Sequence, residues 1–169
     1  MGQRLVITIH AFDEDIAKIY YHWSAYTMCA LNVAQDIVEN VDWESCTNKD
    51  ELILKITRHI EKSGGGVEYS DRKTFAEKYP NEKFNDAPSR NDGLIAITSH
   101  GMGELQYWSE GDLTINFDEQ NIHNFVFFIY NSREELLEGF DESEQGDIKV
   151  EDFPKLDSDP GEFEFGQFE

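Results

Sequence analysis

The spacing of apolar and polar residues predicts a hairpin at the start of the chain. Residues 4–12, RLVITIHAF, alternate apolar and polar side chains, which is typical of a half-buried strand. Residues 17–23, AKIYYHW, are β-branched and aromatic, and they predict the return strand. The acidic residues DED between these two segments supply the expected turn.

The apolar period then changes from two residues to about 3.6 at Ser24. Apolar side chains recur at every third or fourth position as far as Val41, which predicts an amphipathic helix over residues 26–41 with Ser24 as its N-cap. A second helix is expected over residues 50–62, ended by the glycines at 64–66.

Thr47 and Asp50 resemble a capping box at the start of this second helix. The polar, proline-containing residues 66–91 predict a long connection, with a short helix at 72–78. Long connections often carry function, so this loop is one candidate site.

The next part of the chain indicates further strands. We expect one at residues 94–98, and two more within ELQYWSEGDLTINF, on either side of a turn at 109–112. The apolar run at 124–131, NFVFFIYN, is typical of a central strand. SHGMGELQYW matches no phosphate-loop pattern despite its two glycines, and it is interpreted as a flexible connection between strands.

Because strands and helices fall in separate blocks, the sequence predicts an α+β fold. We expect an antiparallel sheet of about five strands with the two main helices packed on one face. Residues 1–133 would form this compact domain. Residues 134–169 would be an acidic, phenylalanine-containing segment that packs on the domain or extends from it, after a short helix that begins beyond Ser132.

Charge is the most unusual property of the composition. The chain has 35 acidic and 14 basic residues, a formal net charge of −21. Residues 134–169 alone hold 14 acids and two bases. Such a chain repels nucleic acid and anionic membranes and attracts basic surfaces, which cells use mainly to bind nucleic acid.

The sequence also bears on location. The N-terminal residues lack the uninterrupted apolar stretch of a signal peptide, and no window reaches the ~20 apolar residues of a membrane span. Cys29 and Cys46 form no CxxC motif, which favours two free thiols. We therefore expect a cytoplasmic protein.

The stretch FDESEQGDIKVEDF resembles the calcium loop of an EF-hand. Counting from Asp141, glycine and isoleucine occupy the expected sixth and eighth positions. Gln145 replaces a carboxylate, Lys149 places a cation at the ninth position, and Asp152 is too short for the usual bidentate contact. The sequence therefore favours a solvated turn and no metal cofactor, with a single EF-hand-like calcium site as an alternative.

His22, in YYHWSAY, marks a second alternative. A histidine at a strand-to-helix junction is a candidate site residue for a small enzyme, although the sequence leans against catalysis. The other interpretation is an aromatic cluster that closes the hairpin against the helix, with His22 hydrogen-bonded nearby. The pattern IY-x-HW-x-x-Y resembles one found in small phage and prophage proteins.

In size, charge and predicted fold class the chain resembles small acidic phage proteins that inhibit restriction enzymes or CRISPR nucleases. The resemblance implies an anti-CRISPR-like inhibitor that imitates a DNA backbone and occupies a basic nucleic-acid-binding surface of its partner, without binding nucleic acid or membrane itself. The residues expected to contact this partner are acids and phenylalanines of the C-terminal segment: Asp141, Glu142, Glu144, Asp147, Glu151, Asp152, Phe163 and Phe165. The two phenylalanines have an alternative role, which is to close the sheet.

Overall fold

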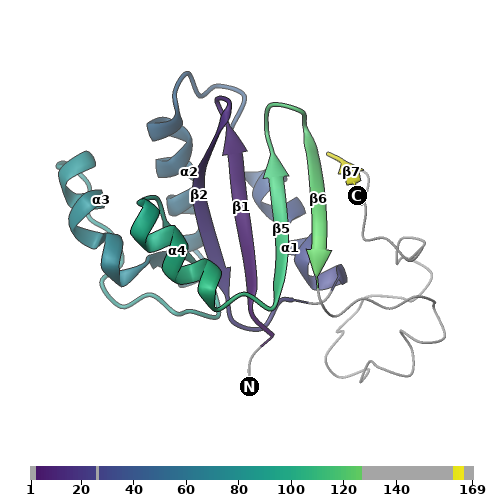
Figure 1. The fold of residues 1–169 in the computed structure, drawn as a ribbon. Helices are drawn as coiled ribbons and strands as arrows, with labels where there is room; N and C mark the ends of the chain where they lie inside the picture. Colours follow the sequence, from purple (N-terminus) through teal and green to yellow (C-terminus); the bar gives the residue numbers. More distant parts are fainter. Residues whose placement is uncertain (1–2, 26, 127–161, 166–169) are drawn as a thin grey trace.

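A mixed β-sheet forms the centre of the computed structural model, which describes residues 3–25, 27–126 and 162–165 (Figure 1). Over these residues the sheet has seven strands in the order β3-β4-β2-β1-β5-β6-β7. The strands are β1 (Leu5–Ala11), β2 (Glu14–Tyr21), β3 (Gly66–Val67), β4 (Leu94–Ala96), β5 (Gly111–Asn116), β6 (Asn121–Val126) and β7 (Glu162–Glu164). The helices are α1 (Thr27–Asn40), α2 (Lys49–Glu61), α3 (Arg72–Lys78) and α4 (Ser99–Tyr107), with a short 3-10 helix η1 (Tyr69–Asp71) before α3.

The predicted α+β class and the N-terminal hairpin are confirmed, but the sheet differs in detail. β1 pairs with β2 in antiparallel fashion and with β5 in parallel, and β3 is parallel to β4. The sheet is therefore mixed rather than antiparallel. Its central strand is β1, not the apolar run that begins at Asn124, because β6 lies next to β7 near one side of the sheet.

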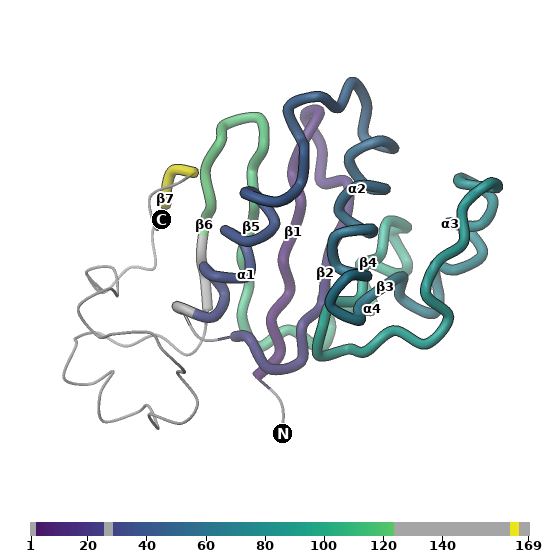
Figure 2. The backbone as a smooth tube through the Cα atoms, turned by 180° about the vertical axis from the view of Figure 1, so that it is seen from behind, coloured from purple at the N-terminus to yellow at the C-terminus, as the bar shows by residue number. Residues whose placement is uncertain are grey.

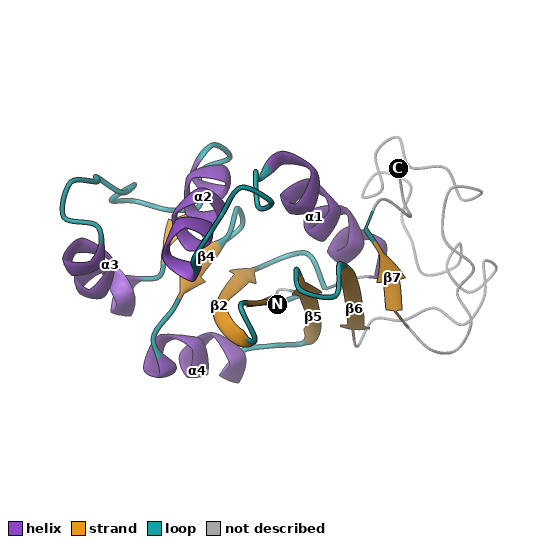
Figure 3. Cartoon of the chain, turned by 90° about the horizontal axis from the view of Figure 1, so that it is seen from above, coloured by secondary structure: helices purple, strands orange, loops and turns teal. Residues whose placement is uncertain are grey.

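Helices cover both faces of the sheet. α1 and α2 lie side by side on one face, as Figure 2 shows from behind, and α4 lies on the opposite face (Figure 3). Leu5, Ile7 and Ile9 of β1 join the core under α1 and α2. Val6 packs with Leu105 of α4 on the other side. β1 is buried on both faces because the sheet is covered twice.

The two main helices agree with the sequence to within one residue at each end. At the start of α2 the cap is Asn48, whose side chain accepts a hydrogen bond from the Glu51 backbone N–H at 3.0 Å. The Glu51 carboxylate in turn accepts from the Thr47 backbone N–H at 3.0 Å. The capping box therefore lies one residue later than Thr47 and Asp50. The short helix expected at residues 72–78 is α3.

Helix α4 corrects the prediction that residues 104–107 form a strand and that SHGMGELQYW is a flexible connection. Thr98 caps this helix by accepting a hydrogen bond from the Gly101 N–H at 2.9 Å. The buried Asp71 carboxylate accepts from the backbone N–H of Ile97 at 2.6 Å, and from the backbone N–H and hydroxyl of Thr98 at 2.9 and 2.6 Å. Tertiary contacts thus start a helix that two glycines argue against locally.

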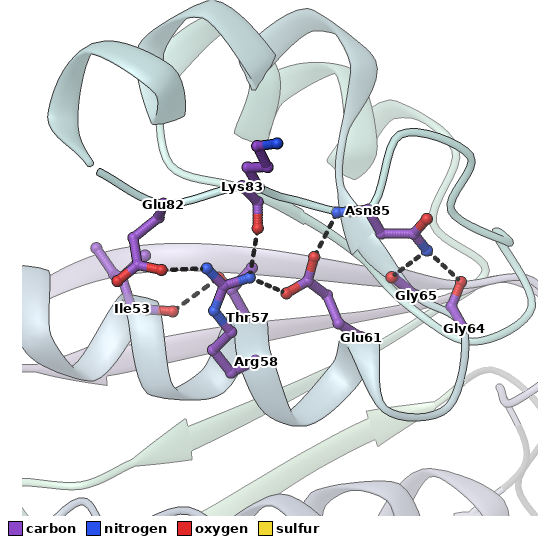
Figure 4. A network of polar contacts seen from close by, with 9 residues as sticks. All are labelled: Ile53, Thr57, Arg58, Glu61, Gly64, Gly65, Glu82, Lys83 and Asn85. Carbon is purple, nitrogen blue, oxygen red and sulfur yellow. Dashed lines mark hydrogen bonds and ion pairs between the residues drawn. The ribbon is translucent and has the colours of Figure 1, made fainter. Parts of the chain in front are cut away.

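The long connection after α2 is tied to that helix by a polar network (Figure 4). The Arg58 guanidinium donates to the Glu61 carboxylate, to the Lys83 carbonyl and to the Glu82 carboxylate at 2.6, 2.8 and 2.5 Å. Glu61 also accepts from the Asn85 backbone N–H at 2.6 Å. These contacts account for an ordered loop at residues 79–93.

Candidate functional site

Three connections that are far apart in sequence meet at one end of the sheet. The β1–β2 turn lies beside the β5–β6 turn because β1 and β5 are parallel and in register, with His10 opposite Asn116. The Asp118 carboxylate accepts hydrogen bonds from the backbone N–H groups of Phe12 and Asp13 at 3.0 and 2.9 Å. The two turns therefore hold each other in place.

The connection between α1 and α2 completes this end of the molecule. The Trp43 ring lies 5.5 Å from the Phe117 ring, centroid to centroid. The Lys49 ammonium, in the first turn of α2, pairs with the Glu14 carboxylate at 2.6 Å. Figure 1 shows the two turns and this connection at the top of the view, at one end of β1 and β5. We call residues 12–15, 41–48 and 117–120 the acidic end.

The acidic end carries seven carboxylates and no lysine or arginine of its own, although Lys49 and Lys55 of the adjoining α2 pair with Glu14 and Asp42. All seven residues are exposed: Asp13, Glu14, Asp15, Asp42, Glu44, Asp118 and Glu119. By contrast, residues 49–90, which form α2, α3 and most of the long loop, hold nine basic and eight acidic residues. Negative charge is therefore concentrated away from α2 and α3.

Several of these carboxylates are fixed by short contacts. The Ser45 hydroxyl donates a hydrogen bond to the Asp42 carboxylate at 2.7 Å, and this hydrogen bond lowers the pKa of Asp42. His10 lies between two carboxylates, with Nδ1 2.9 Å from Asp15 and Nε2 3.5 Å from Asp118. Asp15, Asp42 and Asp118 therefore present their charges from defined positions.

Phe12 adds an apolar group to this anionic surface. Its side chain is 40% exposed at the tip of the hairpin, between the strands that the Asp118 contacts hold together. Its backbone has a positive φ of 53°, which is uncommon for a bulky residue and places the ring at the turn rather than on either strand. Exposed aromatic side chains, phenylalanine among them, are enriched at protein–protein interfaces.

Two of the residues predicted to contact a partner pack against the core instead of reaching far into solvent. Phe163 is in β7, and Phe165 follows this strand; both are partly buried against the main core. Phe165 lies 5.6 Å from the ring of Trp43 and 5.7 Å from that of Phe117. These contacts support the alternative in which the phenylalanines close the sheet.

The other predicted contact residues belong to the EF-hand-like segment. Asp141, Glu142, Glu144, Asp147, Glu151 and Asp152 lie outside the described residues. Their role as a partner surface stays a prediction, as does the alternative of a calcium loop. Within the described ranges, no group of three metal-ligating side chains converges closely enough to hold a metal ion.

His22 lies in an aromatic cluster after β2. Its Nδ1 is 2.8 Å from the Tyr20 hydroxyl, and its ring meets the Trp23 ring edge-on at 4.7 Å. Burial lowers the pKa of His22, and the neighbouring Arg90 and Arg4 lower it further. A neutral ring with its proton on Nε2 is able to accept a hydrogen bond from the Tyr20 hydroxyl at Nδ1. Among the described residues, no carboxylate is hydrogen-bonded to the His22 ring, whose polar partner is the Tyr20 phenol, so the geometry favours a packed cluster.

The fold and its exposed groups define an α+β protein with a mixed sheet and a strongly anionic end that bears an aromatic side chain. Comparison of the chain with protein-family models, with curated proteins and with solved structures gives no match. Among the described residues, no helix has the length and apolar character needed to cross a membrane.

Proposed function

We propose that this protein is a binding protein that blocks a basic, nucleic-acid-binding surface of another protein, in the manner of an anti-CRISPR or anti-restriction inhibitor. The observation that carries the proposal is the acidic end, where seven exposed carboxylates from three connections lie at the same end of the sheet as the half-exposed Phe12, with Lys49 and Lys55 of α2 pairing with two of them. Lysine and arginine residues that line a DNA channel are the chemical complement of such a surface.

Rigidity distinguishes this surface from a merely acidic one. A flexible acidic chain must lose conformational entropy when it binds, whereas carboxylates held by Ser45 and by backbone N–H groups are already ordered. The parallel register of β1 and β5 places two of the three acidic connections side by side. Negative charge in fixed positions is also what a nucleic-acid backbone offers its proteins.

Charge alone gives weak attraction that falls with salt concentration, because exposed ions are screened. Phe12 supplies a group that is desolvated on contact and slows dissociation. We therefore assign two roles to the acidic end: the carboxylates steer association, and Phe12 anchors the complex. The C-terminal acids from Asp141 onwards would add to the negative charge of the chain.

The proposal predicts that partial neutralisation of the acidic end slows association. In the triple variant Asp13→Asn, Glu44→Lys and Glu119→Lys, no side chain known to hold the fold is changed, and asparagine tolerates the positive φ of 61° at position 13. We expect association at least tenfold slower at low salt, with a smaller difference at high salt. The measurement is surface plasmon resonance against purified CRISPR effector nucleases and restriction endonucleases, with DNA cleavage assayed in parallel.

A matched control separates the site from net charge. The variant Glu77→Lys, Asp86→Asn and Glu104→Lys changes the net charge by the same amount at exposed positions outside the acidic end. We expect it to bind and inhibit nearly as well as the wild type. Equal losses of binding in the two variants would show a general effect of net charge rather than a site. An absence of inhibition across the whole nuclease panel would contradict the proposed function.

The C-terminal acids are tested in the same assay. Reversal of Asp141, Glu142, Glu144 and Asp147 to lysine is expected to weaken binding strongly if these residues share the partner surface. Wild-type inhibition by this variant, together with loss in the acidic-end variant, would restrict the working surface to the described end of the sheet.

Calcium provides a separate test of the EF-hand-like alternative. We expect millimolar calcium to change the melting temperature only slightly, because Gln145, Lys149 and Asp152 depart from the ligand pattern. A site that is saturated 100-fold above its dissociation constant would add about 2.7 kcal/mol to the unfolding free energy. A saturable increase in melting temperature with calcium, absent with sodium, would support the calcium-binding alternative instead.

A further inference from the structure

A cleft of about 300 Å³ lies between α1 and α2, away from the acidic end. One wall comes from α1 and includes Asp36, and the other comes from the end of α2 and includes His59. Tyr21, at the end of β2, and Asp92, in the loop before β4, complete the lining. The volume is at the lower end of the range for small-molecule sites, so the cleft suits a small ligand.

Tyr21 is the unusual residue of this cleft. Its side chain is only 6% exposed, yet its hydroxyl has no hydrogen bond to any residue that the structure describes. Burial raises the pKa of Tyr21, and the Asp36 and Asp92 carboxylates raise it further, so the phenol stays protonated. The hydroxyl lines the cleft, where a ligand with N–H groups is able to donate a hydrogen bond to its oxygen.

The charged residues that line the cleft favour a positively charged ligand. Asp36 and Asp92 both line it, and no lysine or arginine does. One Asp36 oxygen is 2.8 Å from His59 Nε2, and the other accepts from the Asn40 amide at 2.9 Å. The Asp92 carboxylate receives no hydrogen bond from the described residues and remains available to a cation.

The shape of the cleft indicates an organic cation rather than a metal ion. The described carboxylates and histidines do not converge closely enough to coordinate a metal. Val33 and Ile60 provide apolar contact for a carbon chain, and Ser24 and Ser63 provide hydroxyl groups at the rim. An alkylammonium or guanidinium group carries several N–H donors. Asp92 and the Tyr21 oxygen are able to accept hydrogen bonds from them.

We propose that this cleft binds a small organic cation, an ammonium or guanidinium group on a short carbon chain, with Asp92 as its counter-charge and the Tyr21 hydroxyl oxygen as a hydrogen-bond acceptor. Two kinds of molecule carry such a cationic group. One is a free small amine, and the other is another protein, through a lysine or arginine side chain. The proposal is independent of the acidic end, since none of its residues belongs to that surface.

Isothermal titration calorimetry with two probes tests the proposal. Agmatine represents a free amine, and N-acetyl-arginine amide represents an arginine side chain within a protein. We expect saturable one-to-one binding of at least one probe at constant ionic strength, and none of 1,4-butanediol, which has a similar carbon chain but no charge. Binding of agmatine alone would identify a small-molecule site, and binding of the arginine amide would identify a side-chain receptor.

Three variants place the binding in the cleft. We expect Asp92→Asn to weaken it at least tenfold, and Tyr21→Phe, which removes only the hydroxyl, to weaken it about threefold to tenfold. Asp86→Asn, an exposed carboxylate on the same loop outside the cleft, is expected to bind like the wild type. Melting curves establish that each variant is folded. Failure of both probes to bind the wild type, or equal weakening by Asp86→Asn and Asp92→Asn, would overturn the proposal.

Discussion

Replacement of Asp71 by alanine is expected to lower the free energy of unfolding by about 3–4 kcal/mol, which is a large fraction of the stability of an ordinary domain. The Asp71 side chain is fully buried and accepts three hydrogen bonds, from the backbone of Ile97 and from the backbone and hydroxyl of Thr98. Alanine leaves these donors without a partner at the start of α4. Chemical denaturation followed by circular dichroism measures the loss.

Two glycines in α4 provide a matched test of the same contact. A Cβ atom at Gly101 would lie 2.3 Å from an Asp71 oxygen, whereas a Cβ at Gly103 meets nothing within 4 Å. We expect Gly101→Ala to destabilise the protein by about 1–3 kcal/mol and Gly103→Ala to stabilise it by about 0.4–1 kcal/mol, since alanine restricts the unfolded chain. Equal effects at the two positions would contradict the packing of Asp71 against α4.

The double variant Asp71→Ala with Gly101→Ala adds a further check. Alanine at position 71 removes the atoms that a Cβ at position 101 would meet. The double variant should therefore lose less unfolding free energy than the sum of the two single losses. Strict additivity would show that the two residues act independently.

The parts of the fold that the sequence predicted depend on local periodicity. The change of period at Ser24 marks the passage from the hairpin to α1, and the isoleucines of α2 define its buried face. Both signals lie within a single element, so they do not require knowledge of its neighbours. The helix α3 also lies at the bounds that the sequence predicted.

The parts that the sequence did not predict depend on contacts between distant residues. Helix α4 contains two glycines, and its start is held by Asp71, which is 26 residues from Ile97 along the chain. The parallel pairing of β1 with β5 has no local signature either, because any strand with the right pattern is able to pair in either direction. The prediction of a strand at ELQYW used only the residues of that segment. It did not take into account the distant contact with Asp71 that starts the helix.

The acidic end was missed for a related reason. Its carboxylates come from three short segments, whereas the C-terminal acids are adjacent in sequence and dominate any window of net charge. One signal was present: each segment combines acids with an aromatic residue, at Phe12, Trp43 and Phe117. An aromatic residue repeated beside acidic turns indicates connections that pack together, and Trp43 and Phe117 do so.

The phenylalanines of the chain therefore fall into two groups with opposite expected behaviour. Phe165 packs on Trp43 and Phe117, and its backbone N–H donates to the Gln120 carbonyl at 3.2 Å. Phe12 is half-exposed at the acidic end and makes no ring contact with another described aromatic residue. The first position is built into the core, and the second is available to a partner.

Replacement of Phe165 by alanine is expected to lower the unfolding free energy by about 2–3 kcal/mol, somewhat less than at a fully buried phenylalanine. Below the melting temperature this variant should inhibit a target nuclease as the wild type does, because the seven carboxylates of the acidic end and Phe12 are unchanged. Phe12→Ala should show the reverse: a loss of stability smaller than that of the Phe165 variant, since Phe12 is 40% exposed, but dissociation at least tenfold faster. Melting curves and surface plasmon kinetics on the two variants separate the roles. Faster dissociation of the Phe165 variant with normal stability would return this residue to the partner surface, where the alternation of acids and phenylalanines first placed it.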